Sequence, residues 1–321
     1  MKKKILIVTT GGTIAMKKNS PFGVIPDDEF VEQLRVFPNL EDVAEIVVHE
    51  FMNAPSPFIT PQEMLELSQF IDQEIIKFDG VIVTHGTDTL VETAYFLDLV
   101  LKTEKPVVFT AAMRSNSELG LDGPRNIVGA VRVAAYDQSH GRGVLIVLND
   151  EIDAARDVVK SDSGKTDSFV TPNFGLLGII DPDKIIYYRR LENREKIHTD
   201  CIETNIDLIK CVSNMDDRFI EASIERKAKA IILEAFGRGN VPRSLVPAIK
   251  KALKAGILIF LTSATVTGRV LPEYGYEGGG AYLQKLGVIS GDDLKGIKMR
   301  IKLMILFGKY QDPELVREYF M

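Results

Sequence analysis

Short apolar runs of strand length alternate along the chain with longer segments whose apolar residues recur every three or four positions. Some runs are uninterrupted, as in Val81-Ile82-Val83, which is typical of strands covered on both faces. This alternation predicts parallel βαβ units in an α/β fold. The strands expected in the first part of the chain are residues 4–9, 46–51, 80–84, 107–110 and 143–148.

Residues 60–63 have the sequence of a helix start. Thr60 can act as the N-cap, Pro61 suits the first helical position, and Glu63 can complete a capping box. Apolar residues then recur at a spacing of three to four, which predicts a helix with these positions in the core and not around a cofactor. They are Met64, Leu67, Ile71, Ile75 and Phe78.

The apolar periodicity gives way to charged residues around residues 187–204, which predicts a linker between two domains. We therefore expect an N-terminal domain over residues 1–189, a linker over 190–204 and a C-terminal domain over 205–321. The second domain is expected to be a smaller α/β layer. Its strands are expected at residues 206–212, 230–236 and 257–261, and its helices near 218–227, 242–254 and 292–306.

The composition is that of an ordinary soluble globular protein. Of the 321 residues, 45% are apolar and 26% are charged, and 39 basic against 45 acidic side chains give a net charge of −6. This mild acidity offers no broad attraction for phosphate backbones. We therefore expect no nucleic-acid partner.

No segment of the sequence has the pattern of a secretory signal or a membrane span. Only four apolar residues follow the basic residues 2–4, and no apolar run is long enough to cross a bilayer. Cys201 and Cys211 are ten residues apart, which fits neither a C-x-x-C pair nor a disulfide framework. We expect reduced thiols, a cytoplasmic location and no membrane partner.

Hydroxyl residues and glycines follow two of the expected strands. Thr13 ends the run TTGGT at residues 9–13, and Thr87 lies in the run THGTD at residues 84–88. In open α/β sheets ligands bind beyond the carboxyl ends of the strands, and glycine lets the backbone turn tightly beside a ligand. The first run has neither the glycine spacing of a dinucleotide site nor the ending of a phosphate-binding loop, so it does not indicate a nucleotide.

Helix capping is the alternative explanation of the second turn, because Thr89 and Glu92 have the spacing of a capping box. Two such turns, one of them beside the carboxylate of Asp88, favour a site with a hydroxyl nucleophile. A hydroxyl needs a base that removes its proton. The four histidines are scattered and no G-x-S-x-G elbow occurs, so a Ser-His-Asp triad is not favoured.

The same runs carry a resemblance to a known family. TTGGTIA at residues 9–15 and THGTDTL at residues 84–90 look like the two motifs of bacterial-type L-asparaginases. The likeness covers essentially the whole chain and continues through residues 111–114, 121–126, 148–150, 156–160 and 236–240. It implies a larger N-terminal domain with a mixed or parallel sheet, and a smaller flavodoxin-like C-terminal domain.

The resemblance implies hydrolysis of the side-chain amide of L-asparagine to L-aspartate and ammonia, without metal or organic cofactor, through an acyl-threonine intermediate. Thr13 matches the family's primary nucleophile. Thr87, Asp88 and Lys160 match a second triad, in which the lysine amine helps to activate the threonine or relays a proton. Without the resemblance, Lys160 would be interpreted as a solvated lysine.

The resemblance also implies how a substrate is held. It places Asp88 at the ammonium group, Ser56 at the α-carboxylate and the backbone carbonyl of Ala112 at the scissile amide nitrogen. Asn240 and Glu277 match residues that a neighbouring subunit lends to the site, which implies a homodimer or homotetramer; the alternative for Glu277 is an exposed acid on a loop. The full set expected to bind substrate is Gly12, Ser56, Thr87, Asp88, Ala112, Asn240 and Glu277.

One position near the first motif departs from the family pattern. Val24 stands where the family commonly has a tyrosine, and valine can neither accept nor donate a proton. A water, Lys160 acting through Thr87, or another residue of the loop must then activate Thr13. The loop itself, residues 16–26, has the composition of a flexible lid.

The sequence leaves the substrate preference and two other functions open. L-glutamine is a second candidate substrate. Pro57 stands where secreted members tend to carry glutamine, and the loss of that adaptable amide bears on how strongly L-glutamine competes with L-asparagine, in a direction that the sequence does not give. A related amidotransferase subunit that releases ammonia for charged transfer RNA is one alternative, although such chains usually carry a further domain before the first motif. A sensor that binds asparagine or aspartate with little turnover is the other, because Val24 removes a proton-handling group.

Overall fold

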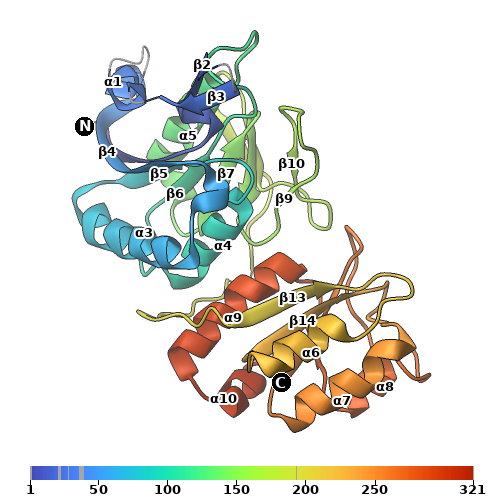
Figure 1. The fold of residues 1–321 in the computed structure, drawn as a ribbon. Helices are drawn as coiled ribbons and strands as arrows, with labels where there is room; N and C mark the ends of the chain where they lie inside the picture. The colour runs from blue at the N-terminus through green and yellow to red at the C-terminus, as the bar shows by residue number, and fades with distance from the viewer. Residues whose placement is uncertain (1, 21–22, 28, 36–39, 193, 321) are drawn as a thin grey trace. The chain divides into compact units, whose positions relative to one another are not determined.

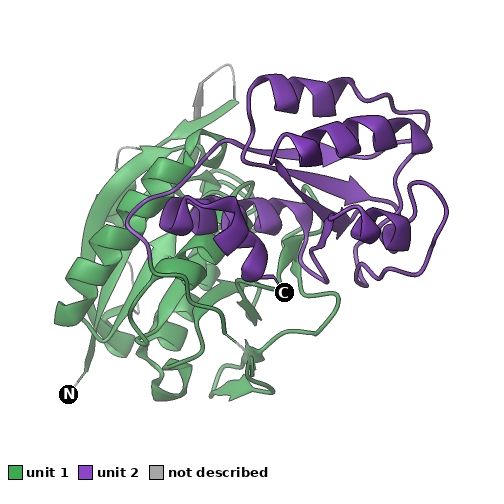
Figure 2. Ribbon diagram, turned by 90° about the horizontal axis from the view of Figure 1, so that it is seen from below, with its two compact units in different colours: residues 1–198 green, residues 199–321 purple. Residues whose placement is uncertain are grey.

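Figure 1 shows the computed structural model, which describes residues 2–20, 23–27, 29–35, 40–192 and 194–320. The chain divides into two compact units, Met1–His198 and Thr199–Met321 (Figure 2). Each unit has its own sheet and its own hydrophobic core. The two-domain α/β prediction is therefore confirmed.

The N-terminal unit is built on an eight-stranded mixed sheet. In spatial order its strands are β12 (Ile185–Tyr187), β11 (Gly178–Ile180), β8 (Glu151–Ala154), β7 (Val144–Leu148), β6 (Val107–Thr110), β5 (Gly80–Thr84), β1 (Lys3–Gly11) and β4 (Ala44–Ala54). The strands from β7 to β4 run parallel and are the five predicted from the sequence. The antiparallel strands β8, β11 and β12 have only three or four residues, too few for a visible pattern.

The strand order puts the two hydroxyl turns beside each other. Strand β1 lies between β4 and β5 and pairs in parallel with both. Counted in chain order, the five parallel strands are arranged 2-1-3-4-5, which is the order of flavodoxin-like sheets. In such sheets ligands bind where the order reverses, which here is between the carboxyl ends of β1 and β5. Thr13 follows β1 and Thr87 follows β5.

Helices cover both faces of this sheet. The helix α5 (Gly123–Ala135) and the short helices α1 (Phe30–Arg35) and α2 (Leu40–Val43) share a core with Ile5 and Ile7 of β1. The helices α3 (Pro61–Glu74) and α4 (Leu90–Val100) pack against each other on the opposite face (Figure 1). Alternate β1 residues therefore meet helices on both sides, which explains the uninterrupted apolar runs.

The C-terminal unit has four parallel strands in chain order: β13 (Ile206–Lys210), β14 (Ala230–Ala235), β15 (Leu258–Ser263) and β16 (Ile289–Ser290). Right-handed crossovers between successive strands place α6 (Arg218–Glu225), α7 (Val246–Lys254) and α8 (Gly280–Lys285) on one face. The helix α9 (Gly296–Tyr310) covers the other face and packs on α10 (Pro313–Glu318). This smaller parallel α/β unit confirms the fold class expected for the C-terminal domain.

The predicted start of α3 is confirmed. Thr60 Oγ1 accepts a hydrogen bond from Glu63 N at 3.3 Å, and Glu63 Oε2 accepts one from Thr60 N at 2.7 Å. The predicted core positions of this segment are all buried: Met64, Leu67, Ile71, Ile75 and Phe78.

Strands β2 (Met16–Ser20) and β3 (Gly23–Pro26) pair as an antiparallel hairpin, in the segment whose composition predicted a flexible lid. The base of the hairpin is anchored at Asp27, whose N–H donates to the carbonyl of Ala15 at 2.8 Å and whose buried carboxylate lies 2.7 Å from Lys17 Nζ. Burial alone would raise the pKa of Asp27, but the hydrogen bonds from Lys17, Glu29 N and Gln33 lower it overall. The composition did not indicate this hairpin, because Gly, Asn and Ser are common both in irregular loops and in the tight turns of hairpins.

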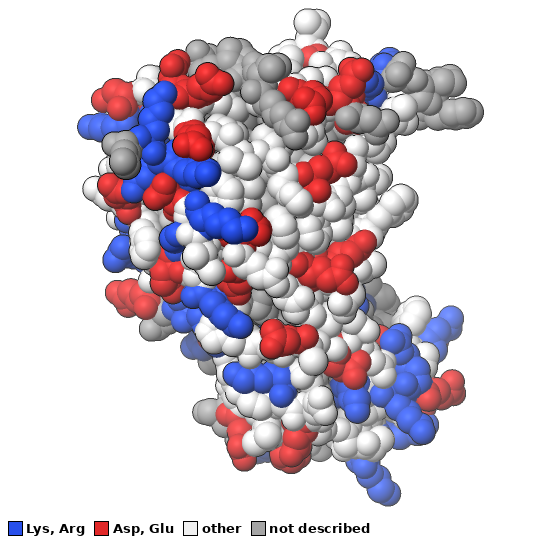
Figure 3. All heavy atoms as spheres, turned by 90° about the vertical axis from the view of Figure 1, so that its left-hand side faces the viewer, with Lys and Arg blue, Asp and Glu red and all other residues white. Residues whose placement is uncertain are grey.

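Among the described residues, no helix combines the length and the apolar character that crossing a bilayer requires. Acidic and basic side chains are interspersed on the face drawn in Figure 3.

The capping box yields a stability prediction. Replacing Thr60 by alanine removes the acceptor of Glu63 N–H, so Thr60→Ala is expected to lower the unfolding free energy of the N-terminal unit by about 1 kcal/mol. The control Gln62→Ala lies in the same helical turn but leaves the box intact. Urea denaturation of both variants checks this, and equal midpoints for the two would contradict it.

Candidate active site

The two hydroxyl turns touch through their glycines. Gly12 has a φ of +85°, and a Cβ added to it would lie 2.3 Å from the Cα and N atoms of Gly86. Only glycine fits this close approach of two backbones. Thr10 adds a hydrogen bond from Oγ1 to the carbonyl of Thr84 at 2.9 Å. The turn after β1 and the turn after β5 are therefore one structure.

Ser56 lies against the second turn from the end of β4. A Cβ at Gly86 would lie 2.7 Å from both Cβ and Oγ of Ser56. The Ser56 carbonyl accepts a hydrogen bond from Thr89 Oγ1 at 2.8 Å. Thr89 occupies the N-cap position of α4 but makes no side-chain cap bond. The capping-box explanation of Thr89 and Glu92 is thus wrong, because the hydroxyl holds Ser56 instead.

Lys160 reaches the second turn from a separate hairpin, formed by β9 (Val159–Lys160) and β10 (Phe169–Val170). Its Nζ donates to Thr87 Oγ1 at 3.0 Å and lies 2.7 Å from Asp88 Oδ1. The Lys160 side chain is 19% exposed, whereas Asp88 is 62% exposed. The residues alone suggested a solvated lysine, and only the family resemblance pointed to this contact. Sequence spacing could not, because 73 residues separate Lys160 from Thr87.

Thr13 opens the short 3-10 helix Thr13–Ala15, directly after the glycine contact. Its side chain is half-buried, and its hydroxyl donates no hydrogen bond within the described part of the chain. The hydroxyl is therefore available to a ligand, whereas the Thr87 hydroxyl is already held by Lys160.

Ala112 approaches the first turn from the end of β6. A Cβ at Gly123 would lie 3.2 Å from Cγ1 of Ile14 and 3.5 Å from Cβ of Ala112. Ala112 and the neighbour of Thr13 thus meet at the start of α5. The N-terminal unit thereby gathers the candidates at the carboxyl ends of β1, β4, β5 and β6: Gly12, Thr13, Ser56, Thr87, Asp88 and Ala112.

His85 is a fully buried, neutral side chain. Its Nδ1 lies 2.8 Å from the carbonyl of Gly86 and must carry the proton, because a carbonyl only accepts. Burial lowers the pKa of His85 to about 4. The histidine thus fixes the backbone of the second turn. Its Nε2 is buried with no partner among the described residues.

Asn240 and Glu277 lie together in the C-terminal unit. Asn240 follows β14, and its Oδ1 accepts a hydrogen bond from Gly280 N at 3.3 Å. Glu277 accepts a hydrogen bond from Arg243 Nε, and its side chain is 35% exposed. Both candidates therefore belong to one loop cluster of this unit. That they complete the site of a neighbouring subunit stays a prediction.

The structure also locates the two residues that depart from the family pattern, Val24 and Pro57. Val24 lies in β3 opposite Lys18 and is 45% exposed. Pro57 follows Ser56 in the 3-10 helix Ser56–Phe58. Neither residue supplies a group that can carry a proton.

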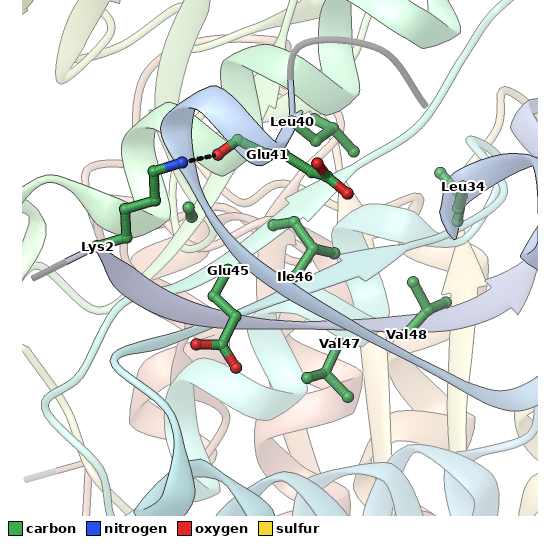
Figure 4. A pocket seen from close by; sticks show the side chains of 9 residues that line it. Lys2, Leu34, Leu40, Glu41, Glu45, Ile46, Val47 and Val48 are labelled. Atoms are coloured by element: carbon green, nitrogen blue, oxygen red, sulfur yellow. Dashed lines mark hydrogen bonds between the residues drawn. The ribbon is translucent and has the colours of Figure 1, made fainter. Parts of the chain in front are cut away.

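Among the described residues, no group of three His, Cys, Asp or Glu side chains could hold a metal ion. A hollow of about 640 Å³ borders the amino-terminal half of β4 and is lined by Leu34, Leu40, Ile46 and Val48 among others (Figure 4). None of the candidate residues is among its lining residues.

Comparison with protein families matches both units. Residues 4–193 match the model described as "Asparaginase, N-terminal", and residues 205–320 match the "Glutaminase/Asparaginase C-terminal domain". Together these matches cover nearly the whole chain.

Individual proteins are similar over their full length. The chain is 38% identical to an L-asparaginase of Bacillus licheniformis, over 97% of this chain and 98% of that protein. It is 32% identical to a glutaminase-asparaginase of Acinetobacter glutaminasificans, over 99% of both chains. Among solved structures, a probable cytoplasmic L-asparaginase from Campylobacter jejuni aligns with a TM-score of 0.88 at 31% identity, over 99% of both chains.

The glycine contact predicts a large effect of one methyl group. Gly12→Ala is expected to cost about 2 kcal/mol of stability more than Gly175→Ala, because its Cβ meets the backbone of Gly86. Gly175 is the matched control: its φ is +74°, and no described atom lies within 4 Å of an added Cβ. Thermal unfolding compares them, and equal losses would show that the turns do not touch.

Burial of His85 predicts sensitivity to acid. The ordinary pKa of 6.5 falls to about 4 on folding, so between these values the unfolded chain binds a proton that the folded chain does not. Stability should fall as the pH drops through this window, by up to about 3 kcal/mol. His85→Asn keeps a donor for Gly86 without the titration and should flatten this part of the profile. Denaturation midpoints between pH 7 and 4 measure it, and an unchanged slope would refute the assignment.

Proposed function

Because the chain belongs to the asparaginase family, we propose that it hydrolyses the side-chain amide of L-asparagine to L-aspartate and ammonia. The observation that carries the proposal is the backbone contact of Gly12 with Gly86, which brings the Thr13 turn against the turn where Thr87 binds Lys160. The L-asparaginase relatives, similar over nearly their whole length, support the same reaction.

In the proposed mechanism the Thr13 hydroxyl attacks the amide carbon. The C–N bond of the tetrahedral intermediate breaks, ammonia leaves, and an aspartyl ester of Thr13 remains. The proton lost by Thr13 goes to the departing nitrogen, carried through the Thr87 hydroxyl that Lys160 holds. Water then attacks the ester, releasing L-aspartate and restoring the hydroxyl. This route needs no tyrosine at position 24.

Substrate binding uses groups around the same turns. Asp88 receives the ammonium group, and its 62% exposure leaves the carboxylate accessible while it pairs with Lys160. Ser56, packed on Gly86, receives the α-carboxylate. Gly12 allows the first turn to approach the ligand, and the carbonyl of Ala112 accepts a hydrogen bond from the amide nitrogen.

The remaining parts of the proposal concern the assembly and the setting. Asn240 and Glu277 complete the site of a neighbouring copy in a homodimer or homotetramer. L-glutamine is a second substrate, in line with the glutaminase-asparaginase relatives. A cytoplasmic location agrees with the similar Campylobacter jejuni structure.

Two pairs of variants test the mechanism. Thr13→Ala removes the nucleophile and is expected to lower kcat by more than about 100-fold, whereas Thr13→Ser retains a hydroxyl and should lose less. Lys160→Met should also lose activity strongly, whereas Lys165→Met, on the same hairpin and 71% exposed, should not. Ammonia release from L-asparagine is the measurement. Binding of asparagine with negligible turnover by the wild type would support a sensor instead.

A further inference from the structure

The start of α5 uses its capping residue in an unusual way. Asp122 occupies the N-cap position, but its side chain makes no capping hydrogen bond. The bond that is missing is one from a backbone N–H of the helix. The carboxylate accepts hydrogen bonds from Met113 N at 2.9 Å and Arg114 N at 3.0 Å. An N-cap aspartate normally satisfies the first free N–H groups of its own helix. Here it holds the backbone of a segment eight or nine residues earlier.

Asn126, one turn later in α5, holds the same segment from the other side. Its Nδ2 donates to the carbonyl of Ala111 at 2.9 Å and to Asp122 Oδ2 at 3.3 Å. Its Oδ1 accepts a hydrogen bond from Asn149 N at 3.0 Å, so the residue also joins the ends of β6 and β7. The side chain is only 3% exposed, which keeps these hydrogen bonds away from water.

The two side chains bracket Ala112. The backbone is fixed at Ala111 by Asn126 and at Met113 by Asp122, while Ala112 itself is fully buried. Among the hydrogen bonds within the described part of the chain, none is accepted by the Ala112 carbonyl. The bracket therefore orients a peptide unit whose carbonyl has no hydrogen-bond donor among the described residues.

We propose, on the basis of the proposed function, that Asp122 and Asn126 are positioning residues that aim the Ala112 carbonyl at the nitrogen of the scissile amide. This aim makes the site selective for amides. An amide nitrogen carries two N–H donors that a carbonyl can accept, whereas an ester oxygen or a free carboxylate presents only lone pairs. Loss of the bracket should weaken the use of amide substrates and spare ligands that lack this donor.

Two variants and a matched control test the proposal in the full-length protein. Asp122→Asn replaces one of the two acceptors by a donor, and Asn126→Ala removes the bond to the Ala111 carbonyl. Arg125→Gln is the control, because Arg125 lies between them in α5 but pairs with Asp150 at the surface with 71% of its side chain exposed. The measurements are kcat/KM for L-asparagine, kcat/KM for the β-methyl ester of L-aspartate, and inhibition by L-aspartate.

We expect kcat/KM for the amide to fall by about tenfold or more in both variants. The ester rate and the inhibition constant of L-aspartate should stay within about twofold of the wild type, and Arg125→Gln should change none of the three. A parallel loss of amide and ester turnover, an unchanged amide rate, or failure of both variants to fold would overturn the proposal. A wild-type protein that hydrolyses neither substrate would instead refute the proposed function.

Discussion

The contact between Gly12 and Gly86 is the constraint on which the site depends. It exists because β1 lies between β4 and β5, so that the turns leaving β1 and β5 face each other at the point where the strand order reverses. A side chain at Gly12 would force the turns apart, and one at Gly86 would collide with Ser56. Without that approach Thr13 would be distant from Thr87. The Thr87 hydroxyl that Lys160 holds could then not relay a proton from Thr13.

Around this contact, the side chains of two N-cap residues form hydrogen bonds to segments near the candidate site and make no capping hydrogen bond to their own helices. Thr89 begins α4 but holds the carbonyl of Ser56, and Asp122 begins α5 but holds the backbone after Ala112. His85 likewise donates its single ring N–H to the carbonyl of Gly86. Each helix gives up a local hydrogen bond, and the backbone around the proposed ligand position becomes rigid. Preorganised backbone groups of this kind lower the cost of orienting a substrate.

Local patterns predicted the local elements well. The five parallel strands, the capping box of α3 and its core positions follow from periodicity and from short-range hydrogen bonding. Strand order and the hydrogen bond from Thr89 to Ser56 were not predicted, because they depend on contacts between residues far apart in sequence. The hairpin after Thr13 is local, but its composition also suits a loop. Thr89 shows most clearly what local patterns cannot predict. Its spacing from Glu92 fits a capping box, yet its hydroxyl donates to the carbonyl of Ser56, 33 residues away. Lys160 was identified by family resemblance alone, and the catalytic roles stay predictions.

The proposed mechanism requires that the hydroxyls of Thr13 and Thr87 contact the same ligand. A crystal structure of the protein with bound L-aspartate tests this most directly. We expect the side-chain carboxylate of the ligand to lie between Thr13 Oγ1 and Thr87 Oγ1, within about 3.5 Å of each. A ligand bound elsewhere, or one that reaches only one of the two hydroxyls, would contradict the account.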